Sequence, residues 1–184
     1  MFSKIIQTYW RVCRLQISPA KTPNNTLLTG LLVIGYVLVK LGLVAVIPKV
    51  AVDQSMTMIR QLIITTISML GYTYLILYSQ SMSNRFIRTI NCLFACAILI
   101  EVMTIPIFLI LPTPPADPSA TVTGAVAIAQ LTAFFALFIF AVWQIVVNVY
   151  IYQQSLSISQ GRAFLVWLGL IATQMSLFFI GGMI

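Results

Sequence analysis

The chain has 184 residues, of which 60% are hydrophobic and only 7% are charged, and its formal net charge is +7. Soluble domains carry about 25% charged residues, so a soluble fold of this composition would expose large apolar surfaces and aggregate. The composition excludes that class and predicts an all-α, multi-pass membrane protein, because apolar runs of this length cross a bilayer as helices.

The first part of the chain, residues 1–18, predicts an amphipathic helix that lies in the cytoplasmic interface of the membrane. Apolar side chains recur at helical spacing on one face, and basic side chains take the other. The aromatic residues are expected at headgroup depth, where the neighbouring arginines meet anionic lipid. The alternative is that the apolar face packs on the cytoplasmic ends of the bundle or on a partner. The residues assigned to the interface are Tyr9, Trp10, Arg11 and Arg14.

Residues 19–184 predict a single membrane domain of five transmembrane helices. Each apolar run approaches or exceeds the roughly 20 residues that a span requires. Thr26 is the expected cap of the first helix. The fourth run is longer than a span needs, which predicts either tilt or a helical extension into the cytoplasm. The five runs cover about residues 26–47, 59–78, 90–111, 122–149 and 163–184.

Basic residues predict the orientation of these spans. Seven of the ten precede the first span or lie in the connections that follow spans two and four. The opposite connections contain Lys49, Asp53 and Asp117. The positive-inside rule therefore predicts a cytoplasmic N-terminus and a C-terminus on the far side. Nucleic acid is not an expected partner, because the basic residues form no patch that could follow a phosphate backbone.

The ionisable residues give little support to catalysis. The chain lacks histidine, which removes the usual general base and the histidine-dependent triads. Asp53 and Asp117 are expected in far-side loops, which leaves Glu101 as the carboxylate within the spans. Cys92 and Cys96 lie one helical turn apart and are interpreted as small packing residues rather than metal ligands. We therefore expect no enzyme activity, no cofactor and no metal.

Polar side chains in the spans follow stripes at helical spacing. Each stripe is expected to face protein or a wet cavity, because polar groups that face lipid are costly. Together the stripes predict a polar interior, accompanied in the fifth span by Gly169. Its members are Tyr36 in the first span, Gln61, Thr65, Ser68 and Tyr72 in the second, Gln130, Gln144 and Asn148 in the fourth, and Thr173 and Gln174 in the fifth.

Two charged residues, Lys40 and Glu101, are expected to pair within the membrane. Spans one and three run in the same direction, and the two residues lie seven and ten positions before the respective span ends. The offset in depth is about 4–5 Å, which a flexible lysine side chain can bridge. Pairing offsets an insertion cost of at least about 2.5–3.5 kcal/mol per charge. Arg60 is the alternative partner, and the pair either fixes helix packing or handles ions.

The stretch RLQISPAKTPNNTLLTGLLVIGYVLVKLGL, residues 14–43, and the plan of five spans resemble small bacterial membrane proteins related to the YIP family. The resemblance implies a bacterial inner (plasma) membrane location and an adaptor or accessory role within the membrane. It carries over no site residue, because the chain lacks the acidic-aromatic DLYGP-like motif of the eukaryotic members.

The expected function is therefore that of a non-enzymatic accessory or scaffold protein. It would associate through its helices with other integral membrane proteins or with itself. The alternative is a small transporter or channel subunit with a polar site around Lys40 and Glu101. A packed interior favours the accessory function, whereas a continuous wet cavity that reaches Glu101 favours transport.

Overall fold

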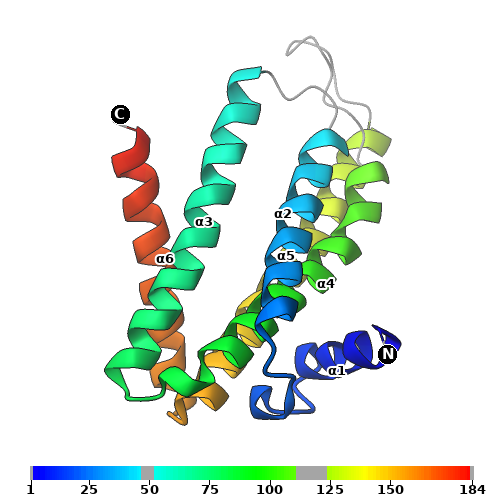
Figure 1. Cartoon of the computed structure of the whole chain (residues 1–184). Helices are drawn as coiled ribbons and strands as arrows, with labels where there is room; N and C mark the ends of the chain where they lie inside the picture. The colour runs from blue at the N-terminus through cyan, green and yellow to red at the C-terminus, as the bar shows by residue number, and fades with distance from the viewer. Residues whose placement is uncertain (1, 47–51, 111–123, 183–184) are drawn as a thin grey trace.

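A computed structural model of the chain describes residues 2–46, 52–110 and 124–182 and is helical throughout its regular elements (Figure 1). Five of the helices are long and apolar enough to cross a membrane. The predicted all-α helical bundle is confirmed, and its five candidate spans indicate a multi-pass membrane protein. The helices are α1 (Phe2–Cys13), α2 (Thr26–Val46), α3 (Val52–Ser79), α4 (Phe86–Ile110), α5 (Gly124–Leu156) and α6 (Gln160–Gly182), with short 3-10 helices η1 (Pro19–Lys21) and η2 (Ser83–Arg85).

The five long helices alternate in direction along the chain. Helix α1 lies across one end of the bundle, together with η1, η2 and the turn between α5 and α6, and we call this the α1 end (Figure 1). Helices α2, α4 and α6 run away from the α1 end, and the C-terminus lies at the opposite end. Helix α4 packs closely along α2 and α5, and α3 packs mainly along α6. Towards the opposite end, α3 leans away from α2 (Figure 1).

The best-packed part of the core lies near the α1 end and is centred on α4. Every residue from 89 to 97 is buried there. Two hydroxyl pairs join helices within this region: Thr73 and Tyr152 lie 2.8 Å apart, and Thr89 and Ser155 lie 2.9 Å apart. These contacts satisfy polar groups that would otherwise be costly to bury.

The structure places α1 against the bundle. Tyr9 is only 2% exposed, and its carbonyl lies 3.9 Å from the Cys96 sulfur on α4. Trp143 of α5 donates a hydrogen bond from Nε1 to the Cys13 carbonyl at 3.1 Å and meets the edge of the Trp10 ring. Burial raises the pKa of Tyr9. Tyr9 therefore lies inside the protein rather than at headgroup depth, because small thiol-bearing residues on α4 let α1 approach closely.

The outward face of α1 remains available for the predicted contact with lipid. Arg11 on α1 and Arg14 directly after it are both exposed. Docking on the bundle and lying in the interface are compatible for a helix with two different faces. Contact between these arginines and anionic lipid stays a prediction.

We expect Trp143→Phe to loosen α1 without unfolding the bundle. The change removes the donor to the Cys13 carbonyl and part of the aromatic contact, which together contribute about 1–2 kcal/mol. Amide hydrogen exchange over residues 2–13 should accelerate about tenfold, whereas residues 89–97 should keep their protection. Trp167→Phe on α6 is the matched control. Equal exchange of α1 in the two variants would contradict the docking described for α1.

Several helix boundaries differ from those predicted. Helix α3 begins at Val52, so Asp53 lies in a helical turn rather than in a loop. Hydropathy missed this turn because polar helical residues resemble a loop, although an acidic residue suits a helix N-terminus.

Asn25, not Thr26, caps α2, since its side chain accepts a hydrogen bond from the Leu27 N–H at 2.9 Å. Helix α5 continues to Leu156, beyond the predicted span end at residue 149, so the fourth helix is longer than the predicted span. The loop expected around Asp117 lies outside the described residues.

Candidate functional site

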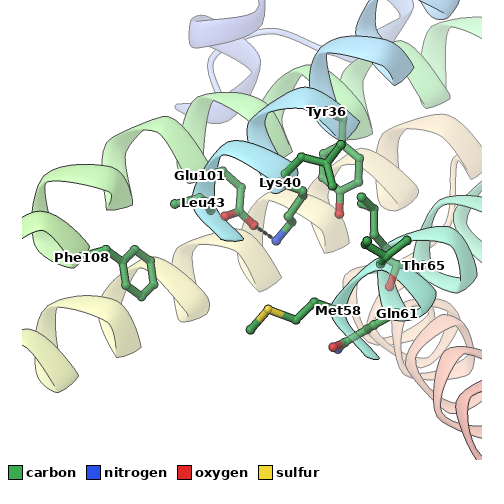
Figure 2. A pocket seen from close by; sticks show the side chains of 11 residues that line it. Tyr36, Lys40, Leu43, Met58, Gln61, Thr65, Glu101 and Phe108 are labelled. Carbon is green, nitrogen blue, oxygen red and sulfur yellow. Dashed lines mark hydrogen bonds and ion pairs between the residues drawn. The ribbon is translucent and has the colours of Figure 1, made fainter. Parts of the chain in front are cut away.

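Lys40 and Glu101 form an ion pair between α2 and α4 (Figure 2). The Lys40 ammonium donates to Glu101 Oε1, and the two side chains are 33% and 24% exposed. Helices α2 and α4 run in the same direction and pack along each other, so residues at similar depth meet. The structure thus brings together the two residues that the sequence paired.

The packing between α2 and α4 explains why the lysine side chain reaches the carboxylate. A Cβ at Gly35 would make an ordinary van der Waals contact with Ile98 at 3.5 Å, which shows that the two helices lie close together here. Tyr36 is buried one turn before Lys40, with its ring against that of Phe94. The Lys40 ammonium lies 5.8 Å from the centre of the Tyr36 ring, within the range of a cation–π interaction. The lysine is therefore held by both an aromatic face and a carboxylate.

A cavity of about 410 Å³ lies beside the ion pair and is lined by α2, α3 and α4. Figure 2 shows Gln61 and Thr65 on α3 and Tyr36 above Lys40 on α2. Two apolar residues of the lining, Leu41 and Ile59, are 38% and 39% exposed, which places them at the rim. The volume falls within the range of small-molecule pockets, and apolar walls with a few polar groups are typical of such sites.

The polar stripe of α3 divides into two parts. Gln61 and Thr65 line the cavity, as expected for an interior position. Ser68 instead donates to the Ile64 carbonyl of its own helix at 2.5 Å. Tyr72 donates to the Val166 carbonyl at 2.8 Å and so joins α3 to α6. The polar stripe of α3 therefore lines the cavity at one end and contacts α6 at the other.

The predicted polar residues of α5 and α6 do not reach this cavity. Gln144 donates to Asn148 at 3.4 Å within α5, and Thr173 donates to the Gly169 carbonyl at 2.8 Å within α6. Each of the predicted residues in these two helices is half-buried. Bonds within a helix reduce the cost of a polar side chain without drawing it into a shared site. The residues that lie apart from the cavity are Gln130, Gln144, Asn148, Thr173 and Gln174.

Arg60, the alternative partner of Glu101, lies towards α6. Its guanidinium is 5.4 Å from the centre of the Phe178 ring. The carboxylate of Glu101 is therefore paired with Lys40 from α2. The apolar lining residues Met58 and Phe108 were not predicted, because nothing in the sequence distinguishes them from neighbours that face lipid.

The site offers opposite charges, a phenol, an amide and a hydroxyl around one cavity. Among the residues described, no cluster of three or more His, Cys, Asp or Glu side chains is placed to hold a metal ion. The arrangement suits binding and orientation of a polar molecule, since it presents a hydrogen-bond donor and acceptor set beside apolar walls. No protein-family model, curated protein or solved structure matches the chain.

Proposed function

We propose that the protein is a non-enzymatic membrane protein that binds a small polar solute at the Lys40–Glu101 cavity, as a transporter or channel subunit does. The observation that carries this proposal is the cavity itself, which is lined by α2, α3 and α4 and reaches the ion pair between α2 and α4. Ionisable groups inside a membrane are costly, and those that line a cavity mark solute or ion pathways. The sequence predicts either an accessory protein or a transporter or channel subunit, and this cavity favours the transporter or channel subunit.

The charges of the cavity indicate a class of solute. A zwitterionic solute can place its anionic group at Lys40 and its cationic group at Glu101. An ion of one sign would leave one member of the pair without a partner, which is unfavourable in a low-dielectric site. Tyr36, Gln61 and Thr65 add polar groups for the remainder of the solute. We therefore propose that the ligand is zwitterionic or strongly dipolar.

Thermal unfolding of the purified protein tests this proposal. The panel contains amino acids and glycine betaine as zwitterions, and acetate and tetramethylammonium as singly charged controls. A zwitterion that binds should stabilise the folded protein by about 2.7 kcal/mol at 100 times its Kd. The double variant Lys40→Leu/Glu101→Leu should lose this stabilisation. A panel in which the zwitterions act no differently from the controls would contradict the proposed ligand class.

We also propose that the α1 end faces the cytoplasm of a bacterial inner membrane. Seven of the ten basic residues belong to segments at this end, and the positive-inside rule supports the orientation. The N-terminus would then be cytoplasmic, and the C-terminus would lie on the far side. The resemblance to YIP-related proteins supports the choice of membrane.

Reporter fusions should follow this topology. An enzyme that is active only in the cytoplasm should be active when fused after Asn84, between α3 and α4. The same enzyme fused after Asp117 should be inactive, because the positive-inside rule places this connection on the far side. A reporter that is active only outside the cytoplasm provides the reciprocal measurement. Cytoplasmic activity at Asp117 would contradict the proposed orientation.

The rim of the cavity supports a second candidate function, that of an accessory subunit. Leu41 and Ile59 expose apolar surface on either side of the opening. A helix of another membrane protein or of a second copy can pack over such a rim. Extraction in mild detergent would then yield a larger assembly that depends on these residues. A monomer in several detergents and in lipid discs would count against this function.

A further inference from the structure

A second cavity, of about 370 Å³, lies at the α1 end and shares no lining residue with the Lys40–Glu101 site. It is formed where η1, the start of α4 and the end of α5 meet. Arg85, Arg88 and Thr89 line one side, and Ser155 and Ser157 line another. The cavity therefore combines two guanidinium groups with several hydroxyl groups.

Both arginines are held in place by backbone carbonyls, and Arg85 also by a serine hydroxyl. Arg85 donates from Nη1 to the Ser155 carbonyl and the Ser157 hydroxyl, each at 2.9 Å. Arg88 donates from Nη1 to the Ala20 carbonyl at 3.1 Å. A guanidinium has five N–H donors, so these bonds orient each group and use only part of its capacity. Arg88 Nε is buried and has no hydrogen-bond partner among the described residues.

Among the described residues, no carboxylate lines the cavity to balance these charges. It contains only three acidic residues. Glu101 is paired with Lys40, and Asp53 lies in the first turns of α3 at the opposite end. Asp117 follows α4 in the sequence and lies outside the described residues. The cavity lining includes no acidic side chain within the described part of the chain.

Helix α4 adds further positive potential. It has 25 residues and begins at Phe86, directly after Arg85 and two residues before Arg88. The positive end of a helix dipole favours anions near the N-terminus. Two partly buried guanidinium groups at such a terminus are costly without a counter-ion. An anion from outside the chain would satisfy the unused donors.

We propose that this cavity binds a phosphate group, which Arg85 and Arg88 contact through charge-assisted hydrogen bonds. Arginine forks match the geometry of phosphate oxygens, and the exposed Ser157 lines the same cavity with its hydroxyl. The phosphate belongs either to the headgroup of an anionic phospholipid or to free inorganic phosphate. Basic pockets between helices at the cytoplasmic side of a membrane are suited to lipid headgroups.

Two titrations of the full-length protein distinguish these sources. In the first, the protein is placed in phosphatidylcholine nanodiscs with increasing phosphatidylglycerol, and thermal unfolding is measured. In the second, inorganic phosphate is added to the protein in a neutral detergent. The wild-type midpoint should rise in at least one titration, and the titration in which it rises identifies the source.

Arg88→Gln is the test variant, and Arg162→Gln is the matched control because Arg162 is exposed and belongs to the same end. Arg88→Gln should need about tenfold more phosphatidylglycerol or inorganic phosphate for the same shift in the midpoint of thermal unfolding. Arg162→Gln should behave as the wild type. Equal losses in the two variants would indicate diffuse surface attraction and overturn the proposal. The absence of any shift in the wild type would overturn it as well.

Arg88→Lys keeps the test decisive if Arg88→Gln does not fold. Lysine retains the charge but replaces the planar fork with a single ammonium. The proposal predicts weaker binding that is still selective for phosphate over chloride at equal ionic strength. Binding by Arg88→Lys that equals the wild type would show that the guanidinium geometry is irrelevant, contrary to the proposal.

Discussion

Leucine at either Lys40 or Glu101 alone will destabilise the protein, and leucine at both positions will restore much of the loss. A single change leaves one charge without its partner between α2 and α4, whereas the double change leaves apolar groups that can pack. Breaking a buried pair costs about 3–5 kcal/mol. Because the side chains are 33% and 24% exposed, we expect about 2–4 kcal/mol for each single variant.

Thermal unfolding of the four proteins in one detergent measures this coupling as a double-mutant cycle. The exchanged pair Lys40→Glu/Glu101→Lys is a useful control, because it restores opposite charges at the same depth. It should be more stable than either single leucine variant. Strictly additive losses in the cycle would show that the pair seen between the helices contributes no coupling energy.

Gly169→Ala will weaken the contact between α3 and α6 by about 1–3 kcal/mol. A Cβ at this position would overlap the hydroxyl of Tyr72, and its distance to Tyr72 Cζ would be 3.2 Å. The ring cannot simply remain in place, because the hydroxyl donates to the Val166 carbonyl at 2.8 Å. Moving Tyr72 therefore sacrifices the hydrogen bond as well as the packing.

Two variants separate this effect from a general effect of alanine. Gly71→Ala is the matched control on α3, since an added Cβ there meets nothing within 4 Å, and it should be neutral or slightly stabilising. Tyr72→Phe removes the overlapping hydroxyl, so Gly169→Ala should cost much less in that background. An undiminished cost in the Tyr72→Phe background would show that the hydroxyl is not the reason for the glycine.

The Lys40–Glu101 pair could be predicted from the sequence because it depends on only two quantities, the direction of each span and the depth of each residue. Both follow from span ends and the helical rise, which apolar runs reveal to within a turn. The lysine side chain tolerates the remaining error of several ångströms. The polar residues of α3 beyond Thr65 were less predictable. A stripe does not reveal whether a hydroxyl bonds to its own helix, as Ser68 does, or to a neighbour, as Tyr72 does.

The position of α1 could not be predicted for a different reason. An amphipathic helix buries its apolar face equally well in lipid or against protein, so its pattern does not identify the surface that covers Tyr9. The answer depends on α4, where Cys92 and Cys96 leave space beside the bundle. Similarly, the second cavity arises from three segments that are distant in sequence, and only their packing brings Arg85 and Arg88 to the end of α5.

The central claim is that the cavity beside Lys40 and Glu101 admits water and polar solutes, and cysteine labelling in proteoliposomes tests it most directly. The three native cysteines are 0% exposed, so their background reactivity should be low. Thr65→Cys places a thiol in the cavity lining, whereas Ile63→Cys places one on the same helix at a position that is 53% exposed on its apolar surface.

A charged, water-soluble methanethiosulfonate reagent reacts with the thiolate, which forms only where water or polar groups stabilise it. We predict that Thr65→Cys reacts at least about tenfold faster than Ile63→Cys, and that a zwitterion from the stabilising panel slows its reaction. Equal, slow reaction of both variants would show a dry interior around the ion pair, and it would contradict the solute-binding function.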